Sequence, residues 1–323
     1  MSIKTIGEMY GVEGIQLSRQ YKQYISGFED WEWRNVAEAY VLFEENLGTR
    51  LSIDETCLSQ DEVYTIVTNK DGHGKKGSLV AMVKGTKSED VIMVLRKMSA
   101  GKRAQVKEVT LDLSPSMKLI VKRVFPCAVQ VSDRFHVQQL MGEALEDLRI
   151  KHRWEAIDQE NTEIQMAKEC DRTFRPHVLS NGETRRQLLA RSKRLLLIHS
   201  SKWTDTQKAR AEVLFRYYPD IKTAYDRYLE LVQIYNTVDA ARPKLLTRLA
   251  RWYERVRKMQ MKSFNTVLET FMNNYDTILN YFDNRATNAS AESFNAKVKA
   301  FRLQFRGVRD IPFFIFRLAT IFA

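Results

Sequence analysis

Residues 63–83 read VYTIVTNKDGHGKKGSLVAMV, and this stretch decides the fold of the chain. Two runs rich in β-branched and apolar residues, 63–68 and 78–83, flank a turn at 69–77 that is rich in glycine and lysine. This pattern predicts two antiparallel strands joined by a hairpin. The turn lacks the Gly-Lys-Ser/Thr ending of a nucleotide-binding loop, so we interpret it as a hairpin alone.

The hairpin is the centre of a longer predicted region over residues 50–140. One strand is predicted before it at 51–54, and two more after it at 106–111 and 128–131. Ser88 is placed to cap a helix that follows the hairpin, and Pro115 starts a second helix. The order β-β-β-α-β-α-β combines an antiparallel meander with parallel crossovers. The predicted fold class is therefore α/β.

The rest of the chain divides into three further predicted regions. Residues 1–49 are helical and mixed, with a faint helix-turn-helix pattern that is too common to assign a role. Residues 141–283 contain only helical patterns, and Thr204 with Gln207 fits a capping box there. Residues 284–323 return to the mixed character of the core.

Composition narrows the class of protein. A chain of 323 residues can bury a real core, and its net charge of +11 favours a polyanionic partner. Three widely spaced cysteines argue against a disulfide framework and against a zinc site. No apolar run approaches the ~20 residues of a membrane span, and the N-terminus has no signal-peptide core. We therefore expect an intracellular protein.

Two aspartates stand where an α/β sheet gathers ligands. Asp54 ends the strand at 51–54, and Asp112 follows the strand at 106–111. If these strands are adjacent and parallel, the two carboxylates converge at the carboxyl edge of the sheet. Such oxygen ligands suit Mg²⁺, and two ions about 4 Å apart support an in-line phosphoryl displacement. For each aspartate taken alone, a cap or turn role is the alternative.

Residues 287–306 predict a basic amphipathic helix that carries one acid near its start. Its polar face, at 3,4 spacing, holds Glu292, Asn295, Lys299, Arg302 and Arg306. Glu292 is placed to complete a three-carboxylate metal pocket, and the other four residues are candidate DNA contacts. Ordinary salt bridges on an exposed helix are the alternative interpretation.

Other candidate residues lie outside this helix. Asp133 and His136 have the spacing to orient a ligand or a scissile phosphate, and a buried histidine–carboxylate pair is the alternative. Arg134 is either a DNA contact or a solvated cation. Trp203 and Trp252 are candidates for stacking on an extruded base, although a helical tryptophan more commonly packs in a core.

Four motifs occur in order along residues 50–323, namely Leu51-Ser-Ile-Asp54-Glu, Val109-Thr-Leu-Asp112-Leu-Ser, Val131-Ser-Asp133-Arg-Phe-His136-Val and Thr287-Asn-Ala-x2-Glu292-Ser-Phe-Asn295-Ala-Lys-Val-Lys299. Together they resemble DDE transposases of bacterial insertion sequences, of the ISL3 type and its ISAon-like branch. The resemblance implies an RNase H-like, retroviral-integrase-like core with a large all-helical insertion before the last catalytic residue.

The resemblance also implies a chemistry. Asp54, Asp112 and Glu292 would be the catalytic residues and would hold two Mg²⁺ or Mn²⁺ ions for DNA cleavage and strand transfer. Asp133 and His136 match an accessory motif with a supporting role. The implied partner is double-stranded DNA, both element ends and target, bound by a homo-oligomer in the cytoplasm at the nucleoid.

One departure from the family is visible. Its members usually carry an N-terminal zinc-binding and helix-turn-helix region, and no such region with cysteine ligands precedes the core here. A separate DNA-binding protein for the element ends and a truncated chain are both compatible with this. Two alternatives to an active transposase stay open: an inactive or domesticated DNA-binding relic, and an RNase H-like nuclease without transposition.

Overall fold

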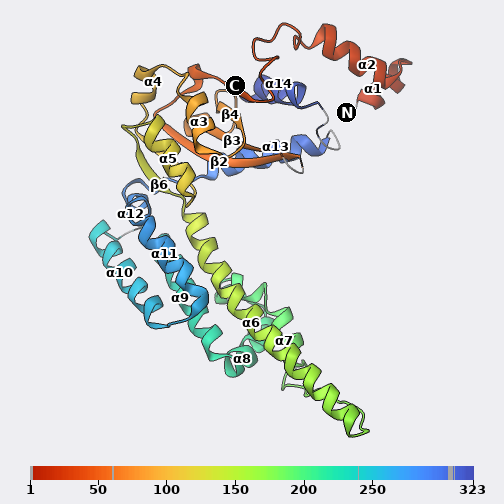
Figure 1. The fold of residues 1–323 in the computed structure, drawn as a ribbon, viewed down its shortest axis with the longest axis vertical. Coiled ribbons are helices and arrows are strands. Elements are labelled where there is room, and N and C mark those ends of the chain that lie inside the picture. The colour runs from red at the N-terminus through yellow and green to blue at the C-terminus, as the bar shows by residue number, and fades with distance from the viewer. Residues whose placement is uncertain (1–2, 60–61, 239, 305–307, 309) are drawn as a thin grey trace. The chain divides into compact units, whose positions relative to one another are not determined.

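The computed structural model describes residues 3–59, 62–238, 240–304, 308 and 310–323 (Figure 1). Contacts between Cα atoms divide the chain into two compact units. We call residues 1–133 with 284–323 the sheet unit, and residues 134–283 the helical unit. No helix among the described residues is long and apolar enough to cross a membrane.

The sheet unit is built on one six-stranded sheet in the order β1-β4-β3-β2-β5-β6. Its strands are β1 Tyr40–Leu42, β2 Arg50–Ser59, β3 Glu62–Asn69, β4 Leu79–Lys84, β5 Glu108–Leu111 and β6 Val129–Ser132. β3 pairs antiparallel with both β2 and β4, and β5 pairs parallel with both β2 and β6. The predicted hairpin and the parallel crossovers are therefore confirmed.

Two sequence-based expectations for this unit are wrong. The edge strand β1 lies in a region expected to be helical, and it forms because Tyr40 to Leu42 pair with β4. Ser88 does not cap a helix: it is the first residue of α3 (Ser88–Leu95), Lys87 precedes it, and no side chain caps that end. Pro115 does begin α5 (Pro115–Val124), as predicted.

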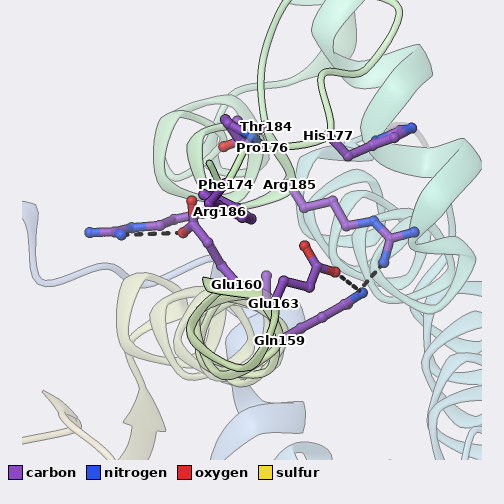
Figure 2. Close-up of a pocket in the computed structure, with 10 residues that line it drawn as sticks. Gln159, Glu160, Glu163, Phe174, Pro176, His177, Thr184, Arg185 and Arg186 are labelled. Atoms are coloured by element: carbon purple, nitrogen blue, oxygen red, sulfur yellow. Dashed lines mark hydrogen bonds and ion pairs between the residues drawn. The ribbon is translucent and has the colours of Figure 1, made fainter. Parts of the chain in front are cut away.

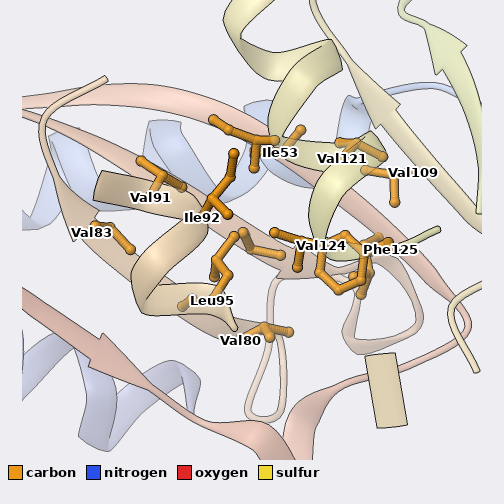
Figure 3. Close-up of a cluster of buried hydrophobic side chains, with 14 of the residues drawn as sticks. Ile53, Val80, Val83, Val91, Ile92, Leu95, Val109, Val121, Val124 and Phe125 are labelled. Atoms are coloured by element: carbon orange, nitrogen blue, oxygen red, sulfur yellow. The ribbon is translucent and has the colours of Figure 1, made fainter. Parts of the chain in front are cut away.

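Helices cover both faces of the sheet because alternate strand residues point to opposite sides. On one face, Ile53 and Val109 share a buried cluster with residues of α3 and α5, shown in Figure 3. On the other, Tyr64 and Ile66 pack with α13 (Ala289–Gln304) and α14 (Ile311–Phe322). The sheet unit also includes α1 Ile3–Tyr10, α2 Gly14–Gln20, the π-helical turn Tyr21–Ile25 and α4 Ala100–Ala104.

The helical unit contains no strand among its described residues. Its helices are α6 Arg134–Glu169, α7 Arg185–Arg191, α8 Asp205–Tyr217, α9 Pro219–Asn236, α10 Arg242–Lys258, α11 Asn265–Asn273 and α12 Tyr275–Asn284, the last residue of which already belongs to the sheet unit. The capping box of Thr204 and Gln207 at the start of α8 is confirmed.

Glu183 is a buried anchor of the helical unit. Its side chain is 6% exposed and forms ion pairs with Arg191 (3.0 Å) and Arg210 (2.9 Å). Burial raises the pKa of Glu183, but the hydrogen bonds from Arg210 and Arg191 outweigh burial and hold this pKa below its ordinary value of 4.5. The charged carboxylate therefore stabilises the fold above pH 4.5, and this contribution is lost as the pH falls through the lowered pKa.

We accordingly expect Glu183→Gln to lower the free energy of unfolding by about 1–3 kcal/mol at neutral pH, because the buried carboxylate loses its ion pairs with Arg191 and Arg210. Below pH 4.5, the variant should lose stability less steeply than the parent. Urea denaturation across pH 3–7 measures both effects. Glu254→Gln is the control, since Glu254 pairs with Arg257 on an exposed surface and should change stability by less than about 0.5 kcal/mol. Equal effects of the two variants would contradict the anchor role.

Candidate active site

Three aspartates follow paired residues of neighbouring strands. Ser52 of β2 pairs with Thr110 of β5, and Thr110 pairs with Val131 of β6. Asp54, Asp112 and Asp133 each come two residues later in the chain. Asp54 is still within β2 and contacts α13 through Asn295, whereas Asp112 and Asp133 directly follow the last residues of β5 and β6.

The neighbouring parallel strands that the carboxylate prediction required are present, although Asp54 does not end its strand. β2 continues to Ser59 because it pairs with β3 over that length. Its parallel pairing with β5 extends only from Arg50 to Ser52. Asp54 therefore lies just beyond the parallel ladder, at the edge where ligands gather in α/β sheets.

The carboxylate of Asp54 is held from two directions. Its Oδ1 accepts a hydrogen bond from the backbone N–H of Glu55 (2.8 Å), and its Oδ2 accepts one from Nδ2 of Asn295 (2.7 Å). Asn295 is 8% exposed and lies on α13, between the core residues Phe294 and Val298. This side chain therefore ties the helix that carries Glu292 to the strand that carries Asp54.

Asn295 corrects one sequence-based assignment. The helical spacing placed it among the DNA-contacting residues, but it is buried and donates to Asp54. Its other amide atom, Oδ1, is buried with no hydrogen-bond partner in the described part of the chain. Burying such an acceptor unpaired costs about 1–3 kcal/mol, which favours a bound water or cation beside it.

The remaining two acids are in different environments. Asp112 is half-buried, and its Oδ1 accepts from the backbone N–H of Ser114 (2.8 Å), so the turn role considered for it is present. Glu292 lies in the first turn of α13 with an exposed side chain, one helical turn before Asn295. Among the described residues, no three Asp, Glu, His or Cys side chains already form a group that could hold a metal ion.

Glu55 was not singled out from the sequence. Partial burial raises its pKa, and the negative charges of Asp112 and Asp54 raise it further. Asp54 and Asp112 are therefore each close enough to act on the charge of Glu55. The donor atoms offered here, carboxylate oxygens and an unpaired amide oxygen, are those that a hard cation such as Mg²⁺ prefers.

A second polar cluster is formed by Lys70 with Glu108 and Thr110 of β5. Lys70 forms an ion pair with Glu108 (2.9 Å) and donates to Thr110. Burial lowers the pKa of Lys70, and the hydrogen bond and charge of Glu108 oppose this. Nearby, Oδ1 of the buried Asp133 accepts from the backbone N–H of Asn288 (3.4 Å). His136 lies on α6 in the helical unit, and the accessory role of Asp133 and His136 stays a prediction.

The candidate DNA contacts are placed differently from one another. Lys299 is exposed, and Arg302 is half-buried with its Nη1 3.5 Å from the carbonyl oxygen of Cys57. Arg306 lies outside the described residues. Arg134 binds within the helical unit, where its guanidinium donates to the hydroxyl of Tyr281 and to Oδ1 of Asn236.

The two candidate stacking residues pack inside the helical unit. Trp252 is fully buried, its indole N–H donates to the carbonyl of Arg227, and its ring lies 4.9 Å from that of Phe271. It offers no face to a DNA base, so core packing is its role in this structure. Trp203 is partly exposed and stacks on Tyr225 with ring centroids 5.4 Å apart.

A cavity of about 250 Å³ lies within the helical unit, between α6 and the segment leading into α7. Figure 2 shows that five of its polar side chains pair with one another. Arg186 pairs with Glu160 (3.3 Å), and Gln159 bonds both Arg185 and Glu163. These charged groups therefore largely neutralise each other.

Comparison with known proteins agrees with the motifs. A family model described as a transposase, of the ISL3-type DDE group, matches residues 51–318. A search of curated proteins returned no match. The matched stretch begins in β2, ends in α14 and contains Asp54, Asp112 and Glu292. Since it spans most of the chain, this protein belongs to the ISL3-type DDE transposase family.

Proposed function

We propose that this transposase cleaves DNA and joins it to a target through divalent metal ions held by Asp54, Asp112 and Glu292. The observation that carries the proposal is the parallel pairing of β2 with β5, which ends at Ser52 and Thr110, two residues before Asp54 and Asp112. The hydrogen bond from Asn295 to Asp54 supports the inclusion of Glu292, because it docks the helix of Glu292 on the same strand.

We also propose that the sheet unit is an RNase H-like core. The order of β2 to β6, three antiparallel strands followed by two that run parallel to β2, supports this assignment, as do the helices on both faces. The edge strand β1 is added to this set by antiparallel pairing with β4. In this scheme residues 50–140 and 284–323 form the core, residues 141–283 an insertion, and residues 1–49 a separate N-terminal region. The return of the chain to the sheet unit at Asn284 is consistent with the scheme.

Each residue has a different role in the proposed site. Asp54 and Asp112 supply carboxylate oxygens from neighbouring strands, and Asn295 with the Glu55 N–H orients Asp54. Glu292 has an exposed side chain that must turn toward the aspartates to complete the site. Two Mg²⁺ or Mn²⁺ ions, when bound, supply activation of the attacking hydroxyl and stabilisation of the leaving oxygen.

The DNA is bound through its phosphates in this proposal. Lys299 and Arg302 follow Glu292 on α13, and the chain carries a net charge of +11. Arg306, which lies outside the described residues, is included from its spacing in the sequence alone. Asp133 and His136 support the site from the end of β6 and the start of α6. Joining requires two element ends at once, so we propose that a homo-oligomer forms on DNA.

The test uses the full-length protein with duplexes that carry the inverted repeats flanking its gene. We expect strand cleavage at the repeat ends and joining to a plasmid target in Mg²⁺ or Mn²⁺, and neither reaction in EDTA. Sequencing the products locates the cuts. Binding without cutting would identify an inactive relic, and cutting of branched or hybrid duplexes without joining would identify a nuclease; either result overturns the proposal.

A further inference from the structure

The turn between β3 and β4, residues 70–77, lies against α13. Nζ of Lys297 donates to the carbonyl oxygen of Gly74 (2.6 Å). A Cβ atom built on Gly74 would lie 3.0 Å from that Nζ and 3.7 Å from Oγ of Ser293. Ser293 follows Glu292 directly, so the turn stands beside the first turns of the helix that carries the proposed catalytic acid.

The base of this turn is fixed. The side chain of Asn69 accepts from the backbone N–H of Asp71, and Asp71 pairs with Arg50 (2.5 Å). Gly72 packs so closely that a Cβ there would lie 2.4 Å from Oγ of Ser78. Gly74 and Gly77 have φ values of +67° and +82°, which favour glycine. The sequence and the contacts therefore specify one shape for the turn.

Charge is distributed unevenly along the turn at residues 70–77. At the base, Lys70 is neutralised by Glu108 and Arg50 by Asp71. At the tip, Lys75 and Lys76 are exposed, and neither forms an ion pair with any residue that the structure describes. Two adjacent cations are thus presented to solvent on a fixed support, close to the start of α13.

We propose that Lys75 and Lys76 bind the phosphate backbone of the DNA strand that lies along α13. The inference rests on the proposed function, because it assumes that DNA occupies the site beside Glu292. Lysine binds phosphate as a point charge, so the contact adds affinity and sets the position of the strand without reading its sequence. The glycine- and lysine-rich turn thereby acquires a role beyond joining two strands.

Removal of both charges by Lys75→Ala and Lys76→Ala tests the proposal. Each phosphate neutralised contributes about 0.9 to the slope of log affinity against log salt, so we expect the double variant to lower the slope by about 1.8. Fluorescence anisotropy with a labelled duplex in EDTA, titrated over a range of NaCl concentrations, measures the slope without any cleavage.

The matched control is Lys122→Ala with Arg123→Ala. These exposed residues lie on α5, which packs on the opposite face of the sheet, and their removal changes the net charge equally. The control should leave the slope within about 0.5 of the parent value. An unchanged slope in the turn variant, or equal losses in both double variants, overturns the proposal. Because no metal is present, the result is independent of whether the parent protein cuts DNA.

Discussion

We expect Asp54→Asn to abolish the proposed metal-dependent cleavage and joining while the protein still folds and binds DNA. If Asp54 holds the ions, its removal forfeits several kcal/mol of charge stabilisation, and about 4 kcal/mol corresponds to a rate loss of roughly 1,000-fold. Asparagine has nearly the same shape and keeps an oxygen that can accept from Asn295. Gel assays of strand cleavage in Mg²⁺ measure the rate, and anisotropy in EDTA measures the binding.

Asp112→Asn and Glu292→Gln should show the same loss. Asp90→Asn is the matched control, because Asp90 is an exposed residue of α3 on the other face of the sheet. Its rate should stay within about twofold of the parent, since it contributes no charge to the transition state. If Asp54→Asn cuts and joins element ends at the parental rate, the carboxylates are not the metal site.

The second large effect concerns Asn295. We expect Asn295→Ala to weaken Mn²⁺ binding about 10- to 100-fold, the usual cost of removing a group that orients a metal ligand. The variant removes the hydrogen bond between α13 and Oδ2 of Asp54. The Asp54 carboxylate and the helix that carries Glu292 are then no longer held in a fixed position relative to each other. Isothermal titration with Mn²⁺ in the absence of DNA measures the affinity directly.

Lys297→Met separates this role from simple helix docking. Lys297 also links α13 to the sheet unit, through the carbonyl of Gly74, but it does not touch Asp54. Both variants should lower the melting temperature of the metal-free protein, and only Asn295→Ala should weaken Mn²⁺ binding. If the two variants bind Mn²⁺ with equal affinity, Asn295 contributes to packing only and does not orient the metal ligand. If the parent protein binds no Mn²⁺, the metal site itself is wrong.

The sequence predicted the centre of the sheet well. Residues 63–83 are dense in β-branched side chains around a glycine-rich turn, so local preferences and tertiary pairing agree. β1 could not be predicted in the same way, because Tyr40 to Leu42 are too few to show a period and become a strand only through β4. β2 likewise runs past Asp54 because β3 pairs with it, and no local signal marks that length.

The sequence also predicted only part of the candidate site, because some of its contacts depend on tertiary packing. Predicted strand ends selected Asp54 and Asp112, although β2 runs past Asp54 to Ser59. Helical spacing assigned Asn295 to the same face as Lys299 without showing what that face contacts. The partner of Asn295 is Asp54, far away in the sequence. Contacts of this kind depend on how α13 crosses the sheet, and periodicity within one helix carries no information about that.

The division of the chain into a discontinuous sheet unit and a continuous helical unit has a consequence for biosynthesis. β2 and β5 leave the ribosome before residues 134–283 are made, and α13 follows them. At about 5–20 residues per second, the strands wait roughly 10–30 s for the helix that carries Glu292 and Asn295. Until then the apolar side chains of Tyr64 and Ile66 have no cover from α13 or α14. Until α13 is made, the proposed site therefore lacks Glu292 and Asn295, and one face of the sheet is without the helices that bury it.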